Sequence, residues 1–170
     1  KGIQHRLEKF HDYTDENESR TVAFFNDSCA TVPEAAAAAS QSFDGRVVLI
    51  TGGTDKGLDF LPLAKCLSQE DGSRYKPYDI YLLAGTGTDK LIPLLKERRV
   101  SFKGPFDSLQ VLLNMLKMSF ISTSSGQVYG RPDSEQVIPV VFSPGATSFG
   151  MFTNEFDRGD KFKKLVKETF

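Results

Sequence analysis

Three short apolar runs of this chain each stop at a corner of small, polar or glycine residues. The corners are Asn26-Asp27-Ser28, Thr51-Gly52-Gly53 and Ser143-Pro144-Gly145. Helix-like segments separate the runs, which is typical of a mostly parallel sheet covered by helices. The carboxyl ends of parallel strands share one edge of the sheet, and ligands usually bind there. The pattern therefore predicts an α/β fold of Rossmann-like type with its site at that edge.

The apolar periodicity assigns residue ranges to this fold. Strands are expected at residues 22–25, 47–50, 80–83 and 137–142. Helices are expected at residues 33–42, 61–67, 90–96, 107–118 and 157–170. The first helix carries five consecutive alanines, and alanine has the highest intrinsic helix propensity. Residues 122–133, which are rich in Ser and Gly, are expected to form a surface loop.

Composition bounds the class of protein. The 170 residues, 39% of them hydrophobic, suit one domain over residues 1–170, since domains usually hold about 100–150 residues. A net charge of -1 gives no bulk attraction to nucleic acid or to a membrane surface. Cys29 and Cys66 stand far apart, so we expect a reducing, cytoplasmic setting. A first residue of Lys1 suggests an excised piece of a longer chain.

Residues 47–58, VVLITGGTDKGL, are similar to the strand and glycine turn that open a short-chain dehydrogenase. Two observations argue against an NAD(P) site there. Pro62 and the residues just before it interrupt the helix that should follow the glycines. In addition, no tyrosine of this chain has a lysine four residues later, so the acid of such an enzyme is missing. We therefore disfavour the dehydrogenase interpretation.

The segment FSPGATSFGMFTNEFDRGDKF, residues 142–162, is more specific. It resembles the late signature of the D-glutamate-adding ligases of the Mur ligase family. GGTDKGLDF at 52–60 resembles the family's Gly-Gly-x-x-Lys-x-x-Asp-Phe corner. IQHRLE and NDSCAT resemble its two early elements, although Cys29 and Val32 stand where the family has Lys and Asn. The four blocks run from His5 to Phe162 and cover nearly the whole chain.

The resemblance implies a Mur ligase C-terminal domain, a three-layer fold with about six strands and one antiparallel edge strand. In this family the third domain brings the incoming amino acid, while two others hold the UDP-sugar peptide and ATP. This chain has no Gly-x-x-x-x-Gly-Lys-(Ser/Thr) phosphate loop, so it matches only the third domain. ATP and Mg²⁺ would then be bound mainly by the central domain. We expect a monomer that is inactive alone.

The implied reaction adds D-glutamate to UDP-N-acetylmuramoyl-L-alanine through an acyl phosphate, in peptidoglycan biosynthesis. D-glutamate carries two carboxylates, which need a cation and hydrogen-bond donors when they are removed from water. By resemblance, Lys56 supplies the cation, and Thr31 and Ser148 supply hydroxyl groups. Backbone N–H groups at Phe149 and Glu155 would complete the cradle.

Three further residues are implied as contacts to ATP across the domain interface. Arg6 and Asp27 match residues that reach the nucleotide when the domains close, and Asn26 is expected to support them. A plain surface ion pair between Arg6 and Asp27 is the simpler alternative.

Simpler roles also exist for the substrate residues. Thr31 could cap the helix that begins near Pro33, Ser148 could begin the next helix, and Lys56 could be a solvated turn lysine. Another alternative for the whole chain is a non-enzymatic ligand-binding or scaffold module with the same fold.

Overall fold

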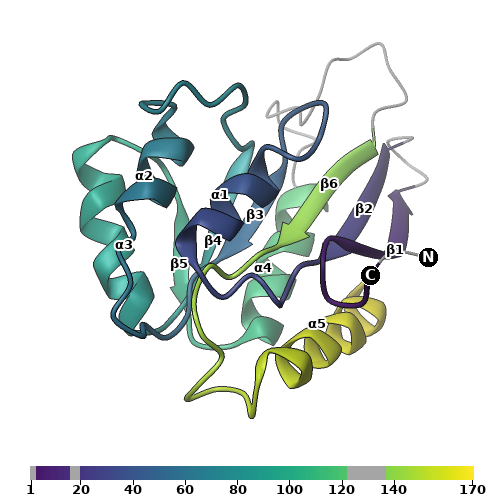
Figure 1. The fold of residues 1–170 in the computed structure, drawn as a ribbon. Coiled ribbons are helices and arrows are strands. Elements are labelled where there is room, and N and C mark those ends of the chain that lie inside the picture. Colours follow the sequence, from purple (N-terminus) through teal and green to yellow (C-terminus); the bar gives the residue numbers. More distant parts are fainter. Residues whose placement is uncertain (1–2, 16–19, 122–136) are drawn as a thin grey trace.

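The computed structural model describes residues 3–15, 20–121 and 137–170, which hold one mixed sheet with helices on both faces (Figure 1). The strands lie in the order β1-β2-β6-β3-β4-β5. Their bounds are β1 Glu8–Asp15, β2 Arg20–Asn26, β3 Val48–Thr51, β4 Asp79–Leu83, β5 Lys103–Phe106 and β6 Val137–Phe142. The helices are α1 Pro33–Ser40, α2 Leu61–Ser68, α3 Thr86–Glu97, α4 Leu109–Ile121 and α5 Glu155–Thr169.

The directions of the strands confirm the predicted sheet. β2, β6, β3, β4 and β5 run parallel to one another, whereas β1 pairs with β2 in the antiparallel direction at one edge. The α/β class, the six strands and the antiparallel edge all agree with the expectation.

Two apolar clusters fill the space between the sheet and its helices. In β3, Val48 and Ile50 face the cluster that contains residues of α4 and α5. The intervening Leu49 faces the opposite cluster, which contains residues of α1, α2 and α3. All three side chains are buried, as expected for a strand covered on both faces. The fold therefore has three layers, helices, sheet and helices.

Two strands were not among the predicted ranges. β5 is only four residues, Lys-Gly-Pro-Phe, and its central residues are exposed. Proline is tolerated at a sheet edge, where its missing N–H is not needed, but such a strand has no apolar alternation to detect. β1 is the other edge, and its sequence EKFHDYTD mixes exposed polar residues with half-buried aromatic ones. Neither strand is a continuous apolar run.

The predicted helices are all present, with shifted ends. α3 begins at Thr86 rather than at residue 90, so its first turn contains Gly87 and Thr88. α4 begins two residues later than predicted, and α5 begins two residues earlier. The predicted loop at residues 122–133 lies outside the described residues.

Candidate functional site at the carboxyl edge of the sheet

The three polar corners lie side by side, because β2, β6 and β3 are neighbouring parallel strands. Backbone bonds join them: Asp27 N donates to Phe142 O at 2.8 Å, and Gly52 N donates to Pro144 O at 2.8 Å. Farther out, Gly145 N donates to Ala30 O at 2.9 Å. The carboxyl edge is thus one continuous surface that combines three distant parts of the sequence.

A buried arginine on α5 holds two of these corners together. Arg158 is 1% exposed, and its Nε and Nη2 donate to Ser28 Oγ and Ser28 O at 3.0 and 2.8 Å. Its Nη1 donates to Ala146 O at 2.9 Å, while Ser28 Oγ donates to Glu155 O at 2.6 Å. Burial lowers the pKa of Arg158 to about 10. Within the described ranges no carboxylate forms an ion pair with this guanidinium, so backbone and hydroxyl oxygens satisfy it. These contacts give Arg158 a structural role.

Asp27 is a buried carboxylate at the end of β2, with 8% of its surface exposed. Oδ1 accepts the N–H of Leu7 at 3.1 Å, and Oδ2 accepts the hydroxyl of Ser143 at 2.7 Å. Burial raises the pKa of Asp27, although both hydrogen bonds and the nearby charge of Arg6 oppose the change. The carboxylate therefore ties the segment that carries Arg6 to the corner after β6.

Asn26 has no exposed surface, and its amide is fully engaged. Nδ2 lies 2.8 Å from His5 Nδ1, and Oδ1 accepts the N–H of Ser28 at 3.1 Å. His5 is itself buried against α5 at Gly159, where an added Cβ would overlap His5 Nδ1. Asn26 thus fixes the residue before Arg6 and offers no open surface of its own.

Arg6 is exposed, which suits a contact with a phosphate group of a nucleotide held by another domain. No ion pair joins Arg6 to Asp27 in the described part of the chain, although their charges interact. The simpler ion-pair interpretation is therefore not what the geometry shows. The roles of Arg6, Asn26 and Asp27 toward ATP stay predictions.

Lys56 lies in the loop after β3, and its side chain is exposed. Asp55 shapes this loop, since Oδ1 accepts the N–H groups of Gly57 and Leu58 at 2.9 Å each. The carboxylate also pairs with Lys90, and that hydrogen bond is the main cause of its lowered pKa. No ion pair of Lys56 is found among the described residues, so its charge is available to a ligand.

The glycines before Lys56 have a structural purpose. Gly52 has a φ of 100°, and a Cβ there would overlap Thr88 Oγ1 and lie 2.7 Å from Leu83 O. The missing side chain at Gly52 lets the end of β3 lie close to the end of β4 and to the start of α3. α2 begins only at Leu61, so no helix opens on these glycines as a dinucleotide pyrophosphate requires. The geometry rules against the dehydrogenase interpretation.

A second loop, between Ser148 and Glu155, faces the Lys56 loop. Thr54 and Thr147 form a two-way backbone bridge, with Thr147 N donating to Thr54 O at 2.9 Å. The hydroxyl of Thr54 also donates to Phe149 O. The two loops that carry predicted substrate contacts are therefore joined directly.

The capping alternatives for the two hydroxyl residues are wrong. The N-cap of α1 is Val32, which has no side chain that can accept the helix N–H groups, so Thr31 does not cap it. The N-cap of α5 is Asn154, whose Oδ1 accepts the N–H groups of Phe156 and Asp157 at 3.0 and 2.8 Å. Ser148 lies six residues earlier and is 5% exposed.

The predicted substrate residues come from three neighbouring segments. Thr31 follows the β2 corner, Lys56 follows β3, and Ser148, Phe149 and Glu155 follow β6. No hydrogen bond joins the Thr31 or Ser148 hydroxyl to another residue that the structure describes. Their assignment to D-glutamate stays a prediction, but each has a polar group that is not used internally.

Sequence reasoning missed the connecting residues of the site. Ser143 was seen only as part of a corner, and Thr54 and Thr147 were not singled out, although all three lie within the matched blocks. Polar residues next to a glycine corner were the available signal. Their partners could not be foreseen, because each bond spans about a hundred residues or more along the chain.

Three absences concern only the described ranges. They contain no cluster of three or more His, Cys, Asp or Glu that could hold a metal ion. None of their helices combines the length and apolar character needed to cross a membrane. Both cysteines are free, and burial is the main cause of the raised pKa of Cys29.

Comparison with known proteins gives close relatives. No protein-family model matches the chain. A UDP-N-acetylmuramoylalanine–D-glutamate ligase of Treponema pallidum is 46% identical over 169 residues, which are 99% of this chain and 27% of that ligase. The ligases of the same name from Roseiflexus and Borreliella burgdorferi are 37% and 36% identical over 98% of the chain. The chain spans less than a third of the length of these three relatives.

Proposed function

Because this chain belongs to the family of the UDP-N-acetylmuramoylalanine–D-glutamate ligases, we propose that its 170 residues form the single amino-acid-binding domain of such an enzyme. The observation that carries the proposal is the shared edge of β2, β6 and β3. There, an exposed Lys56 and the hydroxyls of Thr31 and Ser148 are free of internal partners among the described residues. A dicarboxylate needs this combination of a cation and neutral donors.

The domain holds D-glutamate by its two carboxylates. Lys56 binds one of them as an ion pair, and the hydroxyls of Thr31 and Ser148 donate to the ligand. The N–H groups of Phe149 and Glu155 complete the cradle. Asn154 accepts the next two N–H groups of α5, so the N–H of Glu155 remains free for such a contact. The helix N-terminus also favours a negative charge at that place.

ATP and Mg²⁺ belong mainly to another part of the longer enzyme, and this chain contributes from its outer edge. The Arg6 guanidinium binds a phosphate of ATP, and Asp27 holds the Arg6 segment against the corner after β6. Asn26 supports the same segment through His5. These contacts would orient the domain so that the D-glutamate amine faces the acyl phosphate of UDP-N-acetylmuramoyl-L-alanine.

Positioning is the domain's contribution to catalysis. This chain would place the amine of D-glutamate, once deprotonated, beside the acyl phosphate, and placement of two reactants is worth about 7–11 kcal/mol in favourable cases. The domain alone is inactive, because it supplies neither the nucleotide nor the acyl group. Its place is in peptidoglycan biosynthesis in the cytoplasm, as a monomer.

The test is ATP turnover by the longer enzyme that carries this chain, with UDP-N-acetylmuramoyl-L-alanine and a panel of D- and L-amino acids. We expect ADP release to depend on D-glutamate and to be far slower with L-glutamate, which presents the same charges with inverted geometry. Turnover that depends on another amino acid would refute the substrate. An absence of any amino-acid dependence would favour the non-enzymatic module.

A further inference from the structure

A pocket separate from the proposed D-glutamate contacts lies between the start of α4 and the outer face of α5. Its volume is about 410 Å³, within the range of about 300–1,000 Å³ that small-molecule sites occupy. It is lined by Asp107, Ser108, Leu109, Gln110, Met151, Phe152, Lys161, Lys164 and Leu165. Nothing in the proposed function uses these side chains.

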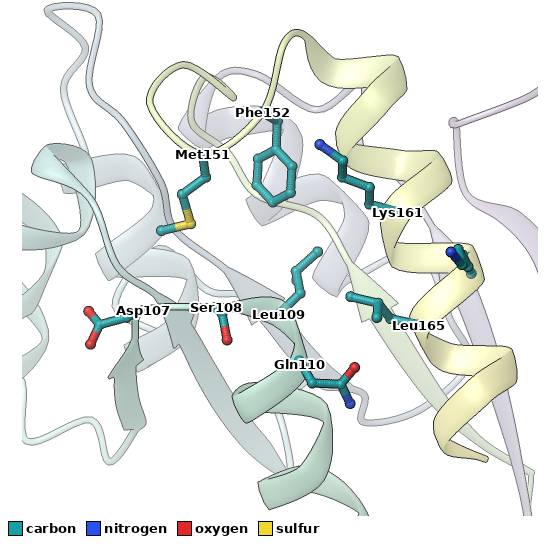
Figure 2. Close-up of a pocket in the computed structure, with 9 residues that line it drawn as sticks. Asp107, Ser108, Leu109, Gln110, Met151, Phe152, Lys161 and Leu165 are labelled. Carbon is teal, nitrogen blue, oxygen red and sulfur yellow. The ribbon is translucent and has the colours of Figure 1, made fainter.

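The interior of the pocket is apolar. Figure 2 shows Leu109, Met151, Phe152 and Leu165 turned toward one common space. Met151 is 38% exposed. The chain has two other methionines, and both lie on α4. An apolar hollow of this kind is suited to the flat hydrocarbon body of a ligand.

One cation that lines the pocket is only weakly paired. Two lysines and one carboxylate line the pocket. The carboxylate belongs to Asp107, which lies on the far side of the pocket from Lys161 in Figure 2. Lys161 is already bound to Asp157 at 2.8 Å. Lys164 is paired more weakly: its Nζ lies 3.8 Å from Glu168 on the same helix, and the two side chains are 74% and 55% exposed. Exposed ion pairs of this kind contribute little, so an anionic ligand can compete with Glu168 for Lys164.

We propose that this pocket binds a small amphiphilic anion, an aromatic or aliphatic body with one carboxylate, sulfonate or phosphate group. The body fills the space between Leu109, Phe152 and Leu165, and the anionic group pairs with Lys164. This binding site does not depend on the proposed ligase activity, so each proposal can be refuted without the other.

One consequence of the site does rest on the proposed function. Met151 and Phe152 belong to the loop whose ends carry Ser148 and Glu155, and Phe152 N donates to Ser148 O at 3.1 Å. A ligand in the pocket would therefore touch the middle of the loop that contacts D-glutamate.

The binding test uses this 170-residue chain and 8-anilinonaphthalene-1-sulfonate, an aromatic monoanion. The protein is labelled with ¹³C at the methionine methyl groups, which gives signals from Met115, Met118 and Met151. We expect saturable one-to-one binding that shifts the Met151 signal. Met115 and Met118 are exposed on α4 and serve as internal controls for unspecific adsorption. Shifts at Met115 and Met118 without one at Met151 would overturn the proposal.

Variants separate the apolar and charged parts of the site. Met151→Glu and Lys164→Glu each place a negative charge beside the ligand, so we expect binding at least about tenfold weaker. Val137→Ser changes an exposed apolar residue at the start of β6 and should leave binding unchanged. N-phenyl-1-naphthylamine, the uncharged counterpart, should bind without sensitivity to Lys164→Glu. Equal affinity of the wild type and both charge variants for the sulfonate would contradict the site.

Discussion

Arg158 shows how a single buried residue can organise the carboxyl edge of a sheet. Its three nitrogens bind two backbone carbonyls and one hydroxyl, on segments that lie 130 and 12 residues away in the sequence. A buried charge is costly unless it is hydrogen-bonded, and here backbone and hydroxyl oxygens, not a carboxylate, accept from each of the three nitrogens. The residue therefore links the β2 corner, the β6 corner and α5.

We predict that Arg158→Met lowers the free energy of unfolding by about 3 kcal/mol, because buried acceptors at Ser28 and Ala146 lose their donors. Urea denaturation measures the change. Arg46→Met is the matched control: Arg46 also donates to two backbone carbonyls, but it is exposed. It should cost less than about 1 kcal/mol. Equal losses of unfolding free energy in the two variants would show that the burial of Arg158 does not cause the destabilisation.

The pKa of Asp27 gives a prediction with a definite sign. Burial raises this pKa above the ordinary 3.8, so the folded state favours the protonated carboxyl. The stability that Asp27 contributes is then fully present below pH 3.8 and is lost as the pH rises through the raised pKa. In the variant Asp27→Asn, the side-chain amide keeps an acceptor for Leu7 and a partner for Ser143, but it does not titrate.

We therefore expect Asp27→Asn to become more stable relative to the wild type as the pH rises from about 3 to 7. Urea unfolding of both proteins at each pH measures this difference, and other titrating groups cancel. A wild type that gains stability over the variant with rising pH would contradict the sign.

At the scale of elements, the sequence predicted most of the fold because buried elements carry the strongest patterns. β3, which is covered on both faces, was predicted to within one residue, as was α2. β1 and β5 are sheet edges with half-exposed side chains, so no continuous apolar run indicated them. The first turn of α3 was hidden behind a Gly-Thr-Gly-Thr sequence that is also typical of a loop.

The site was predictable only in part, for a related reason. The resemblance of the matched blocks to the family assigned Lys56, Thr31 and Ser148 to the substrate, and these assignments stay predictions. The hydrogen bonds that hold the polar corners together could not be predicted, because Arg158 and Ser143 bind partners that only the strand order brings near. The capping alternatives failed because the actual N-caps, Val32 and Asn154, lie at other positions.

The Arg-Gly pair at the start of α5 predicts a packing effect. A Cβ at Gly159 would overlap His5 Nδ1 and lie 2.9 Å from Asn26 Nδ2. Gly159→Ala should therefore destabilise the domain by about 1–3 kcal/mol and displace the neighbouring Arg6. Gly45→Ala is the control, since nothing lies within 4 Å of its added Cβ. Thermal unfolding of both variants measures the effect, and equal midpoints would refute the clash.

At the scale of the whole molecule, the proposed substrate contacts and the proposed nucleotide contact lie at different places along one sheet edge. Lys56, Ser148 and Thr31 lie around the β3, β6 and β2 ends, whereas Arg6 is held beside β2 by the bonds of Asp27 and His5. The fold thus places the proposed substrate contacts and the proposed nucleotide contact on one body. Movement of the whole domain against the remainder of the enzyme would bring both into use together.

The central claim is tested most directly by Lys56→Ala in the longer enzyme, with steady-state KM values for D-glutamate and for ATP. Lys56 is exposed, so its removal should change stability by less than about 0.5 kcal/mol. A charge-assisted hydrogen bond is worth about 1.5–3 kcal/mol, so we predict a KM for D-glutamate raised about 10- to 100-fold. The KM for ATP should stay nearly unchanged, as should both values in the exposed-lysine control Lys65→Ala. Equal increases for D-glutamate and ATP in Lys56→Ala would contradict the account.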